Sequence, residues 1–149
     1  MKGVRHNQAG ITIIEFLIVL PILMMLIMAT AEFGRAFVQY NALTKTLRDG
    51  ARYVGSRALN GTTGVVVINS SLQSQTRNLV VYGNIAGSGT PLLPGLVPGN
   101  VSVTGGAPGA VVVAATYAYT PIFASLPLFQ FGSVTTPFSL QAAVTMRAL

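Results

Sequence analysis

The side chains that could carry chemistry are few and lie near the N-terminus. The carboxylates are Glu15, Glu32 and Asp49, the one histidine is His6, and cysteine is absent. Catalysis needs a nucleophile, a base or a metal, and a zinc or thiol site needs cysteine or clustered histidine. No acidic residue follows Asp49, so the C-terminal two thirds of the chain contains no carboxylate pair. We therefore expect a protein that is not an enzyme and that binds no metal and no cofactor.

The charge balance points to a membrane rather than to nucleic acid. Nine Lys and Arg residues against three acids give a net charge of +6, but only 8% of all residues are charged. Soluble domains usually carry about 25% charged residues. The basic residues are spread too thinly for the clustered surface with which proteins bind nucleic acid. A basic chain that is poor in charge is typical of a membrane protein.

Glu15 is the candidate functional residue because it interrupts an apolar segment. Residues 16–31 carry no charge, and extension back to Ile11 gives a helix of roughly 31 Å, about one hydrocarbon thickness. A carboxylate at mid-bilayer costs about 2.5–3.5 kcal/mol, so such a residue usually has a function. The alternative is that Glu15 lies at the membrane interface, where it would cap the helix N-terminus and gain from the helix dipole.

Two kinds of N-terminal element fit this apolar segment. It could be a retained anchor over residues 11–31. It could also be a cleaved secretory signal, with Lys2 and Arg5 as its basic region and a cleavage site after Ala31. The uncharged run is longer than the usual apolar core of a signal, about 7–15 residues, and nothing in an ordinary signal offsets the cost of Glu15. We expect the anchor and keep a secreted or anchored binding protein (an adhesin) as the alternative.

The residues around Glu15 resemble a known family signature. A basic leader ends at Gly10, and Glu15 follows Ile11 by four residues, as in the class III signals of type IV prepilins and pseudopilins. Further segments fall in the order seen in TadE-like proteins, which are pseudopilins of the tight-adherence (Tad/Flp) pilus system: Ile14-Glu15-Phe16, Leu20-Pro21, Glu32-Phe33-Gly34-Arg35 and Arg48-Asp49-Gly50-Ala51-Arg52-Tyr53. The resemblance is dense over residues 10–55 and weaker over 100–149.

This resemblance implies how the signature residues are used. An aspartyl prepilin peptidase would cut between Gly10 and Ile11, which makes residues 1–10 a leader and leaves a new ammonium group on Ile11. Glu15 and Phe16 would form the assembly contact, in which Glu15 neutralises that ammonium between neighbouring subunits. Such a pair is strong in apolar surroundings when both partners are present.

Partners and location are implied by the same resemblance. The chain would be a minor pseudopilin in pilus biogenesis, adherence and biofilm formation. Its partners would be prepilin peptidase, other pseudopilins, the major Flp pilin and the inner-membrane Tad assembly platform. It would cross the bacterial inner membrane once, with a periplasmic C-terminal domain, and the sequence leaves open whether it enters the extracellular pilus. The distribution of charge does not support this orientation, because only Lys2 and Arg5 precede the apolar segment whereas five basic residues follow it.

One long helix is predicted over residues 11–58, ending before Asn60-Gly61. Its apolar half contains Pro21, which removes a backbone hydrogen bond and is expected to kink or loosen the helix. Its second half, residues 32–58, is amphipathic, with apolar side chains at spacings of three and four: Phe33, Phe37, Tyr40, Leu43, Leu47, Ala51 and Val54.

Residues 59–149 are predicted to form a small head. A helical pattern predicts a second helix near 64–80, although its opening Val-Val-Val-Ile could instead be a strand. Turns rich in glycine and proline surround a short strand at 101–103, and alternating patterns predict strands at 110–119 and 138–147. We expect the last two strands to pair antiparallel.

The apolar connection between those two strands has two interpretations. It could fold back as core, or it could form a patch for another subunit or for the membrane surface, through Ile122, Phe123, Leu126, Leu128, Phe129 and Phe131. A small antiparallel sheet on the amphipathic part of the long helix would bury the apolar faces of both elements. The predicted fold class is therefore α+β, and the resemblance independently implies a pilin-like architecture.

Overall fold

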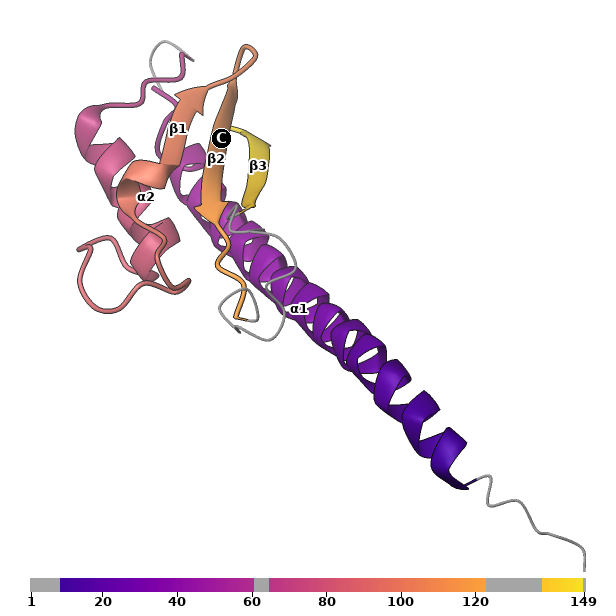
Figure 1. The fold of residues 1–149 in the computed structure, drawn as a ribbon. Coiled ribbons are helices and arrows are strands. Elements are labelled where there is room, and N and C mark those ends of the chain that lie inside the picture. The colour runs from indigo at the N-terminus through magenta and orange to yellow at the C-terminus, as the bar shows by residue number, and fades with distance from the viewer. Residues whose placement is uncertain (1–8, 61–64, 123–137, 149) are drawn as a thin grey trace, which may run out of the picture. The chain divides into compact units, whose positions relative to one another are not determined.

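A long N-terminal helix dominates the secondary structure. The computed structural model describes residues 9–60, 65–122 and 138–148, with side chains from Thr12 onward. Helix α1 (Ala9–Gly55) has 47 residues and continues through Pro21 without interruption (Figure 1). The predicted helix is thus confirmed, and it ends slightly before residue 58.

Two compact units make up the chain. The first is Met1–Arg35 with Pro121–Thr135, and its described part is here called the helical unit. The second is Ala36–Thr120 with Thr136–Leu149, here called the head unit. α1 contributes its first part to the helical unit and its last twenty residues to the head unit.

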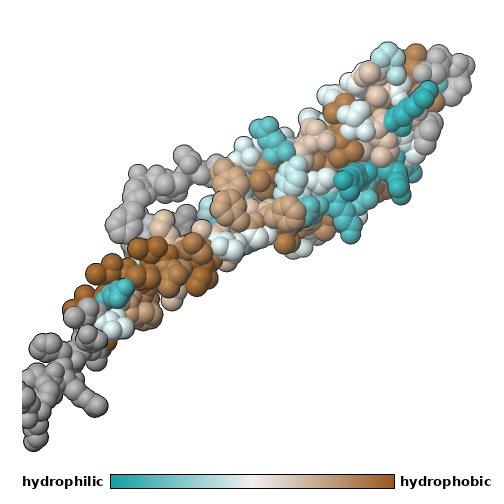
Figure 2. Space-filling model, turned by 90° about the vertical axis from the view of Figure 1, so that its right-hand side faces the viewer, coloured by the Kyte–Doolittle hydropathy of each residue, from teal (hydrophilic) through white to brown (hydrophobic). Residues whose placement is uncertain are grey.

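In the helical unit, α1 exposes large apolar side chains on all sides. Ile13, Ile18 and Leu26 have 61–65% of their surface exposed, and no residue from Thr12 to Ala31 is buried. This part of α1 is long and apolar enough to cross a membrane. Figure 2 shows hydrophobic residues gathered along it. A helix that is apolar on every side is typical of a segment that crosses a membrane or is covered by other apolar chains.

The head unit combines the end of α1 with a short helix and a sheet. Its elements after α1 are α2 (Ser70–Tyr82), the 3-10 helix η1 (Pro98–Asn100), β1 (Val101–Gly105), β2 (Ala110–Ala118) and β3 (Ser139–Arg147). The three strands form one antiparallel sheet in the order β1-β2-β3. The predicted strands and the antiparallel pairing of the last two are therefore confirmed, and so is the α+β fold class.

One face of the sheet is apolar because the side chains of each strand alternate. On the central strand β2, Val111 and Val113 are fully buried, and Tyr117 is 3% exposed. Val113 lies opposite Val103 of β1 and Val144 of β3, so the same face collects apolar residues from all three strands. The opposite face carries small or polar side chains such as Ser102, Thr104, Ala114, Thr116 and Gln141.

Within the head unit, α1 packs on this apolar face (Figure 1). Leu43, Leu47, Ala51 and Val54 are fully buried, as their spacing predicts.

The predicted stripe is wrong at its N-terminal end, where the three aromatic residues are exposed, by 77% at Phe33, 66% at Phe37 and 39% at Tyr40. The reason is that burial along α1 depends on where other elements cover the helix, and its fully buried residues begin only at Leu43.

α2 begins later than the predicted residue 64. Asn69 is its N-cap, with a side-chain oxygen that accepts a hydrogen bond of 2.7 Å from the backbone N–H of Leu72. α2 ends at Gly83, which adopts a left-handed φ of 74° that suits glycine. Before the cap, Val66 forms an antiparallel bridge with Leu59. Residues 65–68 are β-branched and prefer extended backbone, so the strand alternative describes them better.

Two predicted features fall beyond the described residues. The leader is described only from Ala9 onward, and the apolar connection only as far as Ile122. The predictions for Phe123, Leu126, Leu128, Phe129 and Phe131 lie outside the described part of the chain.

Candidate functional site

The predicted processing site lies at the start of α1. Gly10 and Ile11 are in its first turn. The first four N–H groups of a helix have no partner within the helix, so a helix end is the part that opens most easily.

Glu15 lies one turn further along the same helix. Its side chain is exposed, and so are its neighbours Ile14 and Phe16, at 61% and 57%. The carboxylate thus projects from an apolar surface, and no side chain of the head core is near it in sequence.

Pro21 lies in the exposed apolar part of α1. Proline has no N–H, so the carbonyl oxygen of Leu17 lacks its usual helical partner there. Helical backbone nevertheless continues on both sides of Pro21. Local loosening at this residue stays a prediction.

The segment from Glu32 to Arg35 makes one long-range contact that the sequence did not predict. The Glu32 carboxylate oxygen Oε1 accepts a hydrogen bond of 2.9 Å from the backbone N–H of Ile122, 90 residues away. Both residues belong to the helical unit. Glu32 and Arg35 are half-buried, whereas Phe33 is exposed. A Cβ atom added at Gly34 would have no atom of the described residues within 4 Å, so packing within the described part of the chain does not require a glycine there.

In the segment from Arg48 to Tyr53, some residues pack in the head and others are exposed on its surface. A Cβ atom at Gly50 would lie 2.5 Å from Cγ2 of Val80, so only glycine lets α1 and α2 approach this closely. Ala51 is fully buried. The Tyr53 hydroxyl donates a hydrogen bond of 2.7 Å to Oε1 of Gln75 on α2. The charged members of the segment, by contrast, are all exposed: Arg48, Asp49 and Arg52.

Most of the signature residues fall into two groups, and the half-buried Glu32 and Arg35 belong to neither. Gly50, Ala51 and Tyr53 hold α1 against α2 and the sheet. The second group is on the surface and has no packing role in the head core: Glu15, Phe16, Phe33, Gly34, Arg48, Asp49 and Arg52. Surface residues of a shared signature are candidates for contacts with other molecules.

Sequence reasoning missed two partners of the signature residues, Ile122 and Gln75. Nothing local to Ile122 marks it as a partner of Glu32, because the contact joins segments far apart in sequence. Gln75 lies in the polar half of α2, which begins six residues later than the sequence pattern predicts. The pairing of Tyr53 with a polar side chain could have been expected, since a half-buried hydroxyl usually finds a partner.

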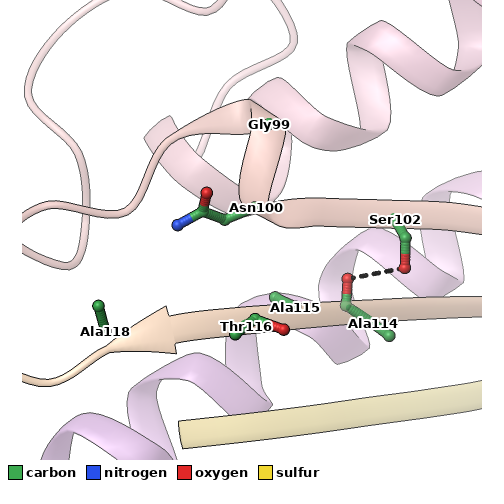
Figure 3. A pocket seen from close by; sticks show the side chains of 7 residues that line it. All are labelled: Gly99, Asn100, Ser102, Ala114, Ala115, Thr116 and Ala118. Atoms are coloured by element: carbon green, nitrogen blue, oxygen red, sulfur yellow. Dashed lines mark hydrogen bonds between the residues drawn. The ribbon is translucent and has the colours of Figure 1, made fainter. Parts of the chain in front are cut away.

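A hollow of about 430 Å³ lies on the polar face of the sheet, beside η1 (Figure 3). It is lined by Gly99, Asn100, Ser102, Ala114, Ala115, Thr116 and Ala118. The Ser102 hydroxyl donates a hydrogen bond of 3.4 Å to the backbone oxygen of Ala114. The lining contains no acid and no base, so neither hydroxyl in it has a group that could activate it for nucleophilic attack.

Together, these features define an α+β protein with a long apolar N-terminal helix and a small antiparallel sheet. Residues 10–52 match the family model described as TadE-like protein. The match begins at Gly10 and ends at Arg52, which confirms the resemblance predicted from the signature. The TadE-like segment supports involvement in Tad pilus systems. No curated protein and no solved structure matches the chain.

Proposed function

We propose that this protein is a minor pseudopilin of a Tad/Flp-type pilus assembly system. The observation that carries the proposal is the TadE-like match, which begins at Gly10 and includes Glu15 on the exposed apolar surface of α1. A carboxylate in that place is costly unless a cation meets it. In this proposal, cleavage before Ile11 creates the cation, which is the new ammonium group of that residue.

Prepilin peptidase would hydrolyse the peptide bond between Gly10 and Ile11. Water adds across the bond, so Gly10 leaves as a carboxylate and Ile11 becomes a new ammonium terminus. In the assembled system, Glu15 of one subunit neutralises the ammonium on Ile11 of its neighbour. The attraction is large in an apolar environment, and loss of one partner leaves an uncompensated charge. Phe16 would pack beside this pair as an exposed apolar neighbour.

The remaining surface signature would meet other components of the pilus system. Phe33 and Gly34 lie just beyond the apolar stretch, and Arg48, Asp49 and Arg52 lie on the head. In this proposal they contact other pseudopilins, the major Flp pilin or the inner-membrane Tad platform. The protein has no catalytic role, and it serves pilus biogenesis and, through the pilus, adherence and biofilm formation. It crosses the inner membrane once with its head in the periplasm.

The alternative is release by signal peptidase after Ala31, as a secreted or anchored adhesin. That cut would fall inside continuous helix, where the Thr30 hydroxyl donates a hydrogen bond of 2.8 Å to the Leu26 oxygen. It would also make Glu32 the first residue, although this side chain contacts Ile122. Both observations favour retention of the helix.

Substitution of Glu15 tests the proposed assembly role. Glu15→Ala and Glu15→Gln should leave cleavage largely intact and should block piliation, because neither side chain can neutralise the ammonium on Ile11. Cleavage is read from the mass of the membrane-extracted protein, and piliation from electron microscopy of cells that carry the variant as their only copy.

Thr30→Ala is the matched control, because the Thr30 side chain is also exposed on the apolar part of α1 and bonds only to its own helix in the described structure. It should assemble pili normally. Normal piliation of both Glu15 variants would remove the role assigned to this carboxylate.

A further inference from the structure

The hydrogen bond between Glu32 and Ile122 fixes a second segment of the helical unit at a defined position along α1. The backbone N–H of Ile122 lies 2.9 Å from Oε1 of Glu32. Ile122 follows Pro121 and comes shortly after β2 in the chain, whereas Glu32 is on α1. The contact therefore brings the chain that leaves the sheet back to the helix at residue 32.

Position 32 coincides with the expected edge of the bilayer. The uncharged stretch of α1 ends at Ala31, and the twenty residues from Thr12 to Ala31 rise about 30 Å, the thickness of the hydrocarbon core. Glu32 and Arg35 are the first charged residues after Glu15. The partner of Glu32 is thus held at the level where hydrocarbon gives way to head groups.

The residue held at this level is apolar and exposed. Ile122 has 53% of its surface exposed although its backbone is hydrogen-bonded. On α1, Phe33 at the same level is 77% exposed. Apolar side chains at the edge of a membrane lower the free energy by entering the boundary between head groups and acyl chains. The neighbouring carboxylate would remain in the polar layer.

We propose that Pro121–Ile122 is a second contact of this protein with the phospholipid surface, and that Glu32 is the positioning residue that holds it there. The occupant of this surface is lipid, because the exposed apolar residue lies beside a helix that is itself exposed and, apart from Glu15, uncharged over the membrane thickness. This inference rests on α1 spanning a membrane and not on the role in pilus assembly. It gives Glu32, a member of the TadE-like signature, a task within its own chain.

A tryptophan scan tests this contact cleanly because the protein contains no tryptophan. Full-length Ile122→Trp is reconstituted into phosphatidylethanolamine and phosphatidylglycerol vesicles whose acyl chains carry bromine close to the head groups. Bromine quenches tryptophan only at short range. We expect blue-shifted emission and a clear loss of fluorescence relative to vesicles without bromine.

Two further variants calibrate the result. Ile18→Trp lies within the exposed apolar part of α1 and should be quenched most by bromine deep in the acyl chains. Ile85→Trp is on the head unit, where the native side chain is 49% exposed, and it should emit at the wavelength of tryptophan in water without quenching. Ile122→Trp should be quenched, like Ile18→Trp and unlike Ile85→Trp. Its quenching should be strongest with bromine close to the head groups.

Two results would overturn the lipid contact. The first is water-like, unquenched emission from Ile122→Trp while Ile18→Trp is quenched. The second is blue-shifted but unquenched emission, which would mean that protein covers the residue. Because Ile18→Trp reports membrane insertion separately, neither result depends on whether the chain is a pseudopilin.

The role of Glu32 is tested in the same background. Glu32→Ala should reduce the quenching of Ile122→Trp and leave that of Ile18→Trp unchanged, since α1 itself stays in the membrane. Glu32→Gln keeps an oxygen that can accept the hydrogen bond, so it should retain most of the quenching. Equal quenching of Ile122→Trp with Glu32 and with Glu32→Ala would contradict the positioning role.

Discussion

Gly34 and Gly50 both lie inside α1, where glycine costs about 1 kcal/mol relative to alanine. At Gly50 the cost has a visible reason, because a methyl group there would meet Cγ2 of Val80 at 2.5 Å. At Gly34 an added Cβ atom would meet no atom of the described residues within 4 Å. Single residues of one signature thus serve different purposes, one in the fold of the head and the other on the surface.

This difference predicts opposite effects of the same substitution. Gly50→Ala should lower the free energy of unfolding by about 1–3 kcal/mol, because the added methyl group overpacks the contact with α2. Gly34→Ala should raise it by roughly 0.5–1 kcal/mol, because alanine favours the helix and meets nothing. Denaturant unfolding of both full-length variants in the same detergent measures the two changes. Destabilisation of equal size in both would contradict this account.

At the scale of elements, the head depends on the face of α1 that runs from Leu43 to Val54. This face and the apolar face of β2 bury each other, and α2 adds Thr76 and Val80. The sheet contributes one apolar face, and its other face carries small or polar side chains. The last twenty residues of α1 are therefore as much a part of the head core as the strands are.

Truncation of one buried leucine should show this dependence. Leu47→Ala should destabilise the head by about 2–5 kcal/mol, since Leu47 is fully buried and its loss leaves a cavity. The matched control is Leu92→Ala, where 52% of the side chain is exposed and the change should be about 0.5 kcal/mol or less. Near-ultraviolet circular dichroism during thermal unfolding follows the tyrosines of the head. Similar midpoints for the two variants would contradict the packing described.

The strands could be predicted from the sequence because alternation at period two is a local signal. Val111, Val113 and Tyr117 show it on β2, and the structure buries all three. The start of α2 was missed because the helical spacing extended into residues 65–68, where β-branched side chains and the Asn69 cap decide otherwise. The exposure of Phe33 and Phe37 could not be predicted, since spacing alone does not say where along a helix its partner begins.

In the candidate site, too, features with a local sequence signal could be predicted and tertiary contacts could not. Glu15 stands out from the sequence because a carboxylate in an apolar run is rare, and the family signature names its neighbours. The contact of Glu32 with Ile122 leaves no local signal in the sequence. The donor is a backbone N–H, which every residue except proline has, so the residue type does not reveal it. Contacts of this kind follow from the tertiary fold and not from spacing.

At the scale of the whole molecule, the charges that flank the membrane segment and the proposed function predict opposite orientations of the head. Lys2 and Arg5 precede the apolar segment, and five basic residues follow it: Arg35, Lys45, Arg48, Arg52 and Arg57. The rule that positive residues stay in the cytoplasm would therefore keep the head inside. The proposed function requires the head outside, where a pilus is assembled.

A reporter fusion after Leu149 decides between these orientations. Alkaline phosphatase, which is active only in the periplasm, should be active when fused there, and a reporter that is active only in the cytoplasm should not. The reverse pattern would place the head in the cytoplasm and exclude it from pilus assembly.

The N-terminal residue of the mature protein tests the central claim most directly. The protein is extracted from membranes of cells that produce prepilin peptidase, and its N-terminus is sequenced. A chain that starts at Ile11 retains Glu15 beside a new ammonium group, and this is the start we predict. A start at Glu32 would show that signal peptidase removes the helix together with Glu15, and it would contradict the proposed function.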